Sequence, residues 1–231
     1  MPTITVTYTN LHALPDPEIA KLSVEEVRRS DNFRANRRRQ EYLCGRALLR
    51  NTLQLATGEP AASFKLAVDA QGKPMCEDGP AVTIAHTGNV VICAVTQQGQ
   101  IGIDIELPHG RHRETDIAQR YFAADEVEWL AKQSQDRFYM LWVLKEAWLK
   151  AIGTGIAGGL GRLRCFVSPP VIDARVSDDA TPALSLHSMD NALIGVATTF
   201  VPPTRPAIYY WDSAAGQFED DNKVRLVAAT R

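Results

Sequence analysis

An α+β fold built from two similar halves is predicted by the order in which helical and extended patterns follow one another. In each half, stretches with helical spacing of apolar residues precede several short alternating stretches. The chain has 231 residues, which is enough for one large domain or two small ones. Pro108, His109 and Gly110 form a plausible joint. We therefore expect an N-terminal subdomain over residues 1–107 and a C-terminal subdomain over residues 108–231.

The first half is predicted to begin with a strand over residues 3–8, where side chains alternate in character. Ser23 followed by Glu26 is a capping box, which indicates a short helix starting there. A longer helix is expected over residues 33–56, ended by Gly58. Strands are then expected over residues 64–68, 82–86, 90–95 and 101–106.

The second half is predicted to hold a helical stretch over residues 116–133 and a stronger helix over residues 137–152. Gly153 and Gly155 end the second helix. A surface loop is expected over residues 168–182, because this segment contains Pro, Asp and Ser residues. Candidate strands lie at residues 162–167, 184–187, 193–199 and 208–211.

Composition is that of an ordinary globular protein, with 45% hydrophobic and 23% charged residues. The formal net charge of −2 gives no support to nucleic-acid binding, although basic residues gather within 34–50. We find no secretory signal and no run of about 18 apolar residues. We therefore expect no membrane segment and a cytoplasmic location. The four cysteines form no CxxC pair, which predicts reduced thiols and no zinc site.

Two carboxylates two residues apart mark the segment Ile101–Glu106. On a strand, the three isoleucines point to one side, while Gly102, Asp104 and Glu106 point to the other. Like charges this close repel each other, and a Mg²⁺ ion would relieve the repulsion. A solvated acidic strand face is the alternative, and for so short a motif taken alone it is the commoner explanation.

A second segment, residues 142–150, combines an acid, a base and tryptophans on one predicted helix. Glu146 and Lys150 lie one turn apart on one face, whereas Lys145 points away from it. Taken alone, these two could form a surface ion pair worth about 0.3–0.5 kcal/mol. Together with Asp104 and Glu106, they supply three metal ligands and a cation for a phosphate oxygen, as Mg²⁺-assisted diphosphate cleavage requires.

The two segments together resemble the paired signature of the 4′-phosphopantetheinyl transferase superfamily. Two further segments agree, since residues 71–74 resemble its Gly-Lys-Pro turn and residues 84–88 resemble its strand-ending segment around a histidine. Chain length and motif separation resemble the monomeric Sfp-type branch rather than the short trimeric branch. The resemblance implies two similar α/β subdomains related by pseudo-twofold symmetry, with the active site at their interface.

For the metal site, the resemblance implies that Asp104, Glu106 and Glu146 hold Mg²⁺, with Mn²⁺ as a possible substitute. Lys150 would contact the diphosphate of coenzyme A (CoA) and stabilise the leaving group. Glu126 matches an acidic position near the active site and competes with Glu146 as the general base.

For CoA itself, the resemblance implies that Lys73 and His86 bind phosphates. Ala85 stands where the family often has serine, so Thr87 is a candidate replacement for the missing hydroxyl. Arg39 and Arg46 are plausible contacts to the 3′-phosphate. The neighbouring arginines at positions 37, 38 and 50 compete for that role, and each arginine could instead lie on a solvated helix face.

The expected reaction transfers the 4′-phosphopantetheine arm of CoA to a serine of an apo carrier protein and releases adenosine 3′,5′-bisphosphate. The carrier could serve fatty-acid, polyketide or nonribosomal-peptide biosynthesis, and we expect the enzyme to be a monomer. Two alternatives remain at this point. One is a metal-dependent pyrophosphohydrolase acting on CoA or nucleotides, and the other is an inactive scaffold that binds CoA or a carrier.

Overall fold

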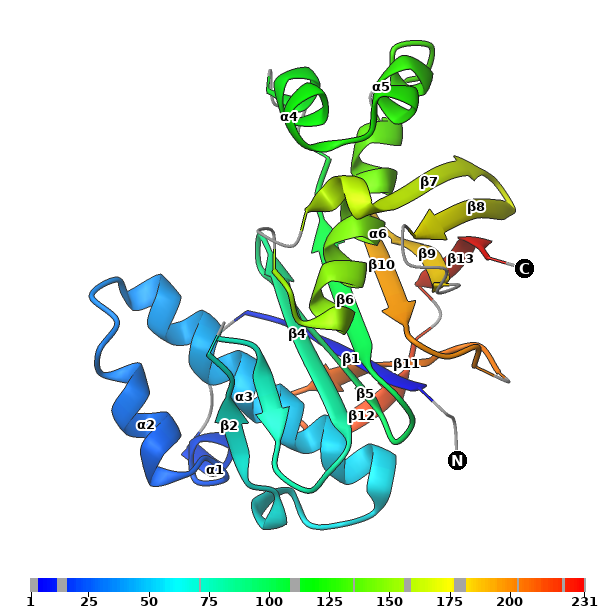
Figure 1. Cartoon of the computed structure of the whole chain (residues 1–231). Helices are drawn as coiled ribbons and strands as arrows, with labels where there is room; N and C mark the ends of the chain where they lie inside the picture. Colours follow the sequence, from blue (N-terminus) through cyan, green and yellow to red (C-terminus); the bar gives the residue numbers. More distant parts are fainter. Residues whose placement is uncertain are drawn as a thin grey trace. The chain divides into compact units, whose positions relative to one another are not determined.

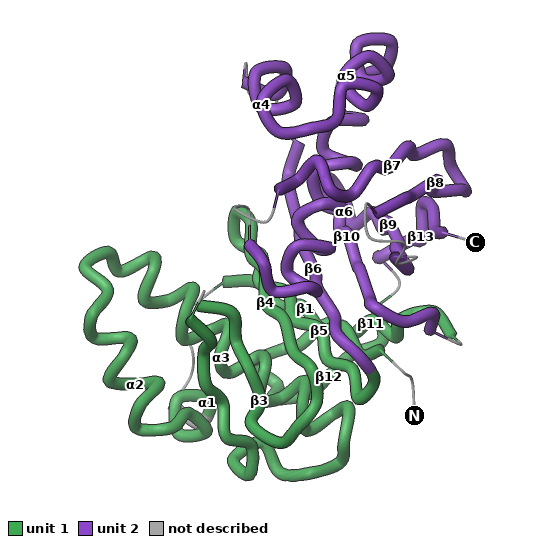
Figure 2. The backbone as a smooth tube through the Cα atoms, viewed as in Figure 1, with its two compact units in different colours: residues 1–98, 203–222 green, residues 99–202, 223–231 purple. Residues whose placement is uncertain are grey.

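The computed structural model describes residues 4–11, 16–70, 72–108, 113–134, 136–155, 159–176, 182–202, 204–221 and 223–230, without the side chains of residues 16 and 17. The chain divides into two compact units, coloured separately in Figure 2. Unit 1 comprises Met1–Gln98 and Pro203–Asn222, and unit 2 comprises Gly99–Pro202 and Lys223–Arg231. Figure 1 labels their helices and strands.

The division therefore falls after Gln98, not after residue 107 as the sequence indicated, and each unit takes a second segment from near the C-terminus. Strand pairing explains the difference. The strand that carries the DxE motif, β6 (Ile101–Glu106), pairs antiparallel with β10 (Ala192–Thr198) of unit 2. A late strand, β11 (Ala207–Asp212), returns to pair parallel with the first strand of unit 1, β1 (Ile4–Asn10).

Unit 1 has a five-stranded sheet in the order β12-β11-β1-β5-β4 and a separate two-stranded sheet. Its long helix, α3 (Asn36–Thr57), packs against β5 and β1. Shorter helices precede it, and a single 3₁₀ turn follows it. The remaining elements of unit 1 are α1 (Asp16–Ile19), α2 (Val24–Ser30), η1 (Ala61–Ser63), β2 (Leu66–Val68), β3 (Pro74–Cys76), β4 (Ala81–Thr87), β5 (Val90–Thr96) and β12 (Gln217–Asp220).

Local signals set the ends of the unit 1 helices. Ser23 and Glu26 form the predicted capping box at the start of α2, which satisfies two backbone N–H groups. Gly58 adopts the left-handed conformation (φ 81°) and ends α3 as predicted. The apolar side of α3, including Leu49 and Leu53, is fully buried in the core of unit 1.

Unit 2 has a six-stranded sheet in the order β6-β10-β9-β13-β8-β7. Its long helix, α6 (Asp136–Ile152), packs mainly against β6 and β10, and the core of this unit gathers around the helix. The other elements are α4 (Glu114–Tyr121), α5 (Ala124–Leu130), η3 (Leu160–Arg162), β7 (Leu163–Ser168), β8 (Val171–Val176), β9 (Ala183–Met189) and β13 (Val224–Ala229).

Helix α6 lies with its backbone directly against the sheet, at two glycines on neighbouring strands. A Cβ atom on Gly102 would come within 1.9 Å of the carbonyl oxygen of Ala147. A Cβ atom on Gly195 would come within 2.4 Å of the carbonyl oxygen of Val143. In the β6–β10 register Gly195 pairs with Asp104 and Gly102 pairs with Ala197, so the two glycines are offset by two positions. Only glycine permits this close approach of helix and sheet.

Several sequence expectations are corrected by the structure. The single helix predicted over 116–133 is two helices, because the chain leaves helical geometry at Phe122 before α5 begins at Ala124. The loop predicted over 168–182 contains β8, while residues 177–181 lie outside the described part. Strands β3, β12 and β13 and helix α1 were not predicted. Helix α1 and strands β3 and β12 have only three or four residues each. Strand β13 pairs with β9, a strand distant in sequence, which local patterns do not indicate.

All four cysteines are free, as predicted; Cys44, Cys93 and Cys165 are buried and Cys76 is half-buried. Across the part of the chain that the structure describes, no helix is both long and apolar enough to cross a membrane.

We predict that Gly102→Ala destabilises the protein by about 3 kcal/mol, since the added methyl group meets helix backbone that has no room to move. Gly161→Ala is the matched control, because its Cβ atom would lie 3.4 Å from the nearest atom. Urea unfolding of both variants measures the difference. Equal stability of the two variants would contradict the close helix–sheet contact.

Candidate active site

The carboxylate of Asp104 and the ammonium of Lys150 meet between strand β6 and helix α6 of unit 2. Lys150 Nζ lies 2.6 Å from Asp104 Oδ1. Asp104 follows Gly102 by two residues and so lies on the strand face that the helix covers. Close packing at Gly102 thus brings the last turns of α6, which carry Glu146 and Lys150, up to this carboxylate. The two segments that the sequence singled out therefore contact each other through Asp104 and Lys150.

Glu146 lies in the electrostatic field of the same group of side chains. Burial is the main cause that raises the pKa of Glu146, from 4.5 to about 7. The negative charges of Asp104 and Glu106 raise this pKa further, while the positive charge of Lys150 lowers it. Its Oε1 atom is buried and accepts no hydrogen bond from any described residue. A buried acceptor of this kind is well suited to a cation.

The donor set fits a hard divalent cation. Asp104, Glu106 and Glu146 offer carboxylate oxygens, which are the ligands that Mg²⁺ prefers. Within the described ranges, no three His, Cys, Asp or Glu side chains are already gathered closely enough to hold a metal ion. One oxygen of the Asp104 carboxylate contacts the Lys150 ammonium instead.

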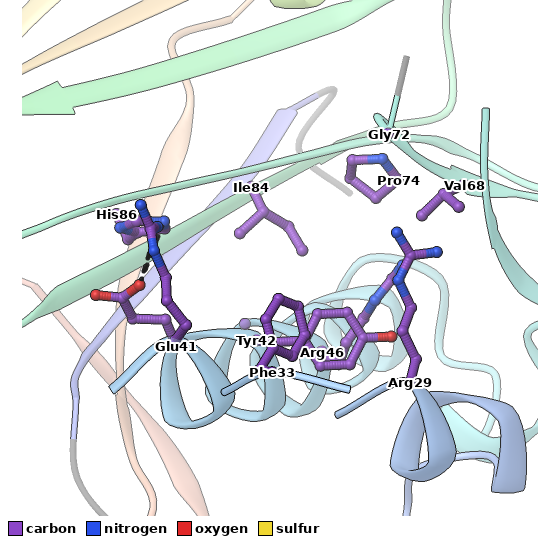
Figure 3. A pocket seen from close by; sticks show the side chains of 12 residues that line it. Arg29, Phe33, Glu41, Tyr42, Arg46, Val68, Gly72, Pro74, Ile84 and His86 are labelled. Atoms are coloured by element: carbon purple, nitrogen blue, oxygen red, sulfur yellow. Dashed lines mark hydrogen bonds and ion pairs between the residues drawn. The ribbon is translucent and has the colours of Figure 1, made fainter. Parts of the chain in front are cut away.

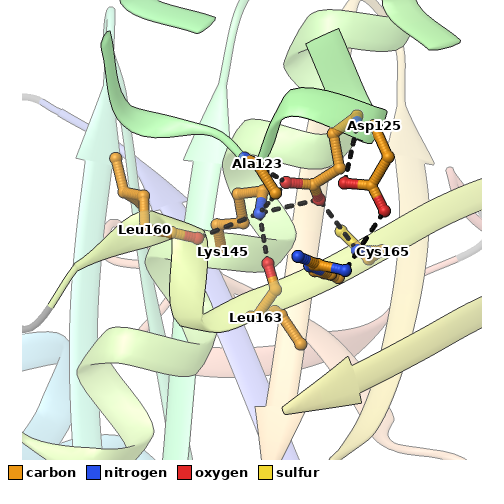
Figure 4. A network of polar contacts seen from close by, with 8 residues as sticks. Ala123, Asp125, Lys145, Leu160, Leu163 and Cys165 are labelled. Atoms are coloured by element: carbon orange, nitrogen blue, oxygen red, sulfur yellow. Dashed lines mark hydrogen bonds and ion pairs between the residues drawn. The ribbon is translucent and has the colours of Figure 1, made fainter. Parts of the chain in front are cut away.

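Glu126 belongs to a different, fully buried network in unit 2, part of which Figure 4 shows. Lys145 Nζ lies 2.8 Å from Glu126 Oε1 and 2.9 Å from Oε2. The carboxylate also accepts hydrogen bonds from the backbone N–H groups of Ala123 (3.0 Å) and Cys165 (2.9 Å). Lys145 in turn donates to the carbonyl oxygens of Leu160 (2.9 Å) and Leu163.

Both side chains of this buried pair have 0% exposure, and both oxygens of Glu126 already accept hydrogen bonds. A general base must reach the proton that it removes. This geometry does not fit the proposed catalytic role of Glu126. It instead ties α6 to the start of α5 and to the segment that enters β7. Lys145 points away from Lys150, as the helical spacing predicted.

Unit 1 contains a pocket of about 280 Å³ with both basic and aromatic walls, shown in Figure 3. Phe33 and Tyr42 are in aromatic contact at 5.3 Å, and the Arg46 guanidinium lies over the Tyr42 ring at 5.5 Å. Nη1 of Arg46 is buried and has no hydrogen-bond partner among the described residues. The lining residues are Arg29, Phe33, Arg38, Glu41, Tyr42, Gly45, Arg46, Val68, Gly72, Pro74, Ile84 and His86.

Two of the five predicted CoA-binding residues, Arg46 and His86, line this pocket. Glu41 connects two of the lining side chains, because its carboxylate lies 3.2 Å from the Arg38 guanidinium and 3.9 Å from the His86 imidazole. The same carboxylate pairs with Arg37 at 3.0 Å. The pocket therefore offers several cations and an unsatisfied guanidinium N–H to an anion.

The other three predicted residues are not among the lining residues. Arg39 pairs with Asp31 at 2.9 Å. Lys73 is half-buried, and burial is the main cause that lowers its pKa, which the nearby Asp69 partly offsets. Thr87 is half-buried at the end of β4. Gly72 and Pro74, on either side of Lys73, do line the pocket.

Arg29 and Glu41 in this pocket were missed at the sequence level, and Arg38 was considered only as a competitor of Arg39. A signal was present, since Arg38, Glu41, Tyr42 and Gly45 follow the three-four spacing of one helix face. Arg50, another competitor, is buried and pairs with Glu26 at 2.8 Å, so it does not face the pocket.

Comparison with known proteins gives consistent matches. Residues 100–196 match the 4′-phosphopantetheinyl transferase superfamily, and residues 33–96 match the N-terminal domain of 4′-phosphopantetheinyl transferases. The 4′-phosphopantetheinyl transferase HetI of Nostoc sp. is 32% identical over 187 residues, covering 77% of this chain and 78% of that protein. A 4′-phosphopantetheinyl transferase of Bacillus subtilis is 33% identical over 148 residues, covering 62% of this chain and 65% of that protein. The human L-aminoadipate-semialdehyde dehydrogenase-phosphopantetheinyl transferase is 27% identical over 176 residues, covering 67% of this chain and 56% of that protein.

We predict that the charge of Glu146 destabilises the metal-free protein as the pH rises. A carboxyl group whose folded pKa is about 7 binds its proton more tightly when folded than when unfolded, so stability falls between about pH 4.5 and 7. The unfolding free energy of Glu146→Gln, relative to that of the wild type, should therefore be about 1–2 kcal/mol higher at pH 8 than at about pH 5.5. Urea unfolding with EDTA at both pH values measures this gain. A pH-independent difference would contradict the raised pKa.

We predict that Glu126→Ala costs about 3–5 kcal/mol of folding free energy, since it leaves the Lys145 ammonium buried without its counter-ion. Glu128→Ala is the control, because Glu128 is exposed and forms an ion pair with the exposed Lys132. The unfolding midpoint of this control should stay unchanged. Replacing the pair together, as Glu126→Leu with Lys145→Met, should cost less than Glu126→Ala alone. The reverse order would refute the ion-pair explanation.

Proposed function

This chain belongs to the 4′-phosphopantetheinyl transferase superfamily, in its Sfp-type branch. From this membership we propose which of its residues transfer the phosphopantetheine arm. The chain is an enzyme that moves the phosphopantetheine arm of CoA to a carrier protein. The observation that carries the site assignment is the meeting of Asp104 and Lys150 beside Glu146, on the two segments that match the family. The serine of an apo carrier is the acceptor, and adenosine 3′,5′-bisphosphate is the product released.

We assign the metal site to Asp104, Glu106 and Glu146, with Mg²⁺ as the natural ion and Mn²⁺ as a substitute. When bound, the cation offsets the negative charge of the CoA diphosphate. The buried Oε1 of Glu146 supports its place in this set. The family match covers all three residues.

Lys150 contributes the positive charge for the leaving group. Transfer forms a bond between the serine Oγ and the phosphorus on the pantetheine side, and it breaks the bond from that phosphorus to the oxygen of the nucleotide phosphate. Negative charge then develops on the departing oxygen. The ammonium of Lys150, which is about a third exposed, can reach a diphosphate oxygen and stabilise this charge.

The proton of the serine hydroxyl goes to Glu146 in this mechanism. Glu126 is the weaker choice, because it is buried against Lys145 with both oxygens accepting hydrogen bonds. In the metal-free protein, burial first and the neighbouring carboxylates second raise the pKa of Glu146 to about 7. A bound cation would lower this pKa, so Glu146 accepts the proton directly or through a water molecule.

The basic pocket of unit 1 is assigned to the phosphates of CoA. Arg46 and His86 are the contacts that both the family resemblance and the pocket support, and Arg29 and Arg38 join them. Lys73, Thr87 and Arg39 remain candidates from the resemblance alone. The partner is an apo carrier of fatty-acid, polyketide or nonribosomal-peptide synthesis. We further propose a monomer that works in the cytoplasm, without nucleic-acid or membrane partners.

The test mixes the protein with Mg²⁺, CoA and a panel of apo carrier proteins. Mass spectrometry should detect one phosphopantetheine arm on the acceptor serine of at least one carrier. A parallel reaction without carrier separates transfer from hydrolysis. Rapid breakdown of CoA in that reaction would favour a pyrophosphohydrolase and overturn the proposal.

We predict that Asp104→Ala lowers the transfer rate at least about 100-fold, because the cation loses a ligand that no other residue replaces. Asp173→Ala is the matched control, as Asp173 is an exposed carboxylate on β8 of the same unit. The control should keep its full rate under saturating CoA. Near-normal turnover by Asp104→Ala, with its fold confirmed by circular dichroism, would refute the metal assignment.

A further inference from the structure

Lys150 holds the carboxylate that the cation needs. Its ammonium lies 2.6 Å from Asp104 Oδ1, a distance typical of a strong charge-assisted contact. The Asp104 side chain is 11% exposed, so the contact is largely shielded from water and salt. A charge pair in such a place is stronger than one on the open surface.

The backbone around this pair leaves little freedom to separate its two partners. Asp104 is fixed by the β6–β10 ladder, and α6 is held against Gly102 and Gly195. The Lys150 side chain is 30% exposed and ends in a flexible stem. Movement of this side chain alone, without movement of helix or strand, is therefore enough to break the contact between Lys150 and Asp104.

The negative charge of the neighbouring carboxylates favours the contact of Lys150 with Asp104 while no other cation is near. Asp104 and Glu106 both act on Glu146 as like charges, and Lys150 acts on it as the opposite charge. An added divalent cation must compete with this ammonium for Asp104 and is also repelled by it. A diphosphate reverses the balance, because its oxygens offer Lys150 a new anionic partner.

We propose that Lys150 is an internal counter-ion that makes cation binding and CoA binding depend on each other. In the free protein the ammonium neutralises Asp104 and weakens divalent-cation binding. When CoA binds, Lys150 transfers its contact from Asp104 to the diphosphate, and the carboxylate becomes available to the cation. This inference rests on the proposed metal ligands. It adds that the cation and CoA are taken up together, and linkage makes the effect reciprocal.

The experiment measures Mn²⁺ binding by the electron paramagnetic resonance signal of the free ion, with the full chain and without carrier, so that no turnover occurs. Wild-type protein should bind Mn²⁺ weakly alone and at least about fivefold more tightly with saturating CoA. Lys150→Met keeps an unbranched side chain of nearly the same length and removes its charge. This variant should bind Mn²⁺ about five- to tenfold more tightly than wild type in the absence of CoA. It should also lose most of the enhancement by CoA.

Two further variants serve as controls. Lys150→Arg keeps the positive charge and should keep the weak binding of Mn²⁺ alone. Lys132→Met removes a lysine that pairs with exposed Glu128 elsewhere in unit 2, and its Mn²⁺ affinity should match that of wild type. Thermal melting of each variant confirms that it is folded.

Unchanged Mn²⁺ affinity of folded Lys150→Met in the absence of CoA would overturn the counter-ion role. The proposed transfer activity would not be affected by that outcome, because mass spectrometry of the carrier tests it separately. An equal enhancement by CoA in wild type and Lys150→Met would also overturn the inference. Failure of wild type to bind Mn²⁺ even with CoA would overturn both this inference and the metal assignment beneath it.

Discussion

Direct contact between the backbone of α6 and two strands is the constraint on which the chemistry of unit 2 depends. Gly102 and Gly195 are the positions where this contact occurs. Any larger residue there would move the helix outward, and every side chain on its facing side would move with it. Asp104 of β6 and Lys150 of α6 can meet because the two backbones come this close.

A second interaction fixes the opposite side of the same helix. Lys145 is the neighbour of Glu146 in sequence, yet it is fully buried and bound to Glu126 and to two carbonyl oxygens. Consecutive residues of one helix thus have different tasks, one anchoring and one chemical. The anchor is expensive in desolvation and tolerates little change. Its effect is that Glu146 and Lys150 project from a helix held on both sides.

How far the sequence foretold this arrangement depends on the element. The strand at Ile101–Glu106 was predicted with the right bounds, because three isoleucines alternate with small and acidic residues. The helix break before Ala124 was missed, since Ala123 has no side-chain cap and Glu126 binds its backbone N–H from within the helix. Strand β8, with the exposed Asp173 and Arg175, looks like loop until its pairing with β7 is known.

For the site, the two motifs indicated that the strand at Ile101–Glu106 and the helix that carries Glu146 and Lys150 work together, and the structure shows contact between Asp104 and Lys150. The same reasoning assigned chemistry to Glu126, because a motif shows that an acid is present but not whether it is buried against a lysine. It also missed Glu41, although the helix-face spacing offered a signal, and it missed Arg29, whose place in the pocket depends on the packing of α2 against α3.

The interleaving of the two units along the chain has a practical consequence for work with fragments. Strands β11 and β12 of unit 1 come from residues between two segments of unit 2, and β13 returns to unit 2 after them. A piece ending at residue 98 would lack the parallel neighbour of β1 and expose that strand as an open edge. Dividing the chain at one position therefore yields neither unit complete. Separating them requires rejoining distant stretches of sequence with an engineered linker.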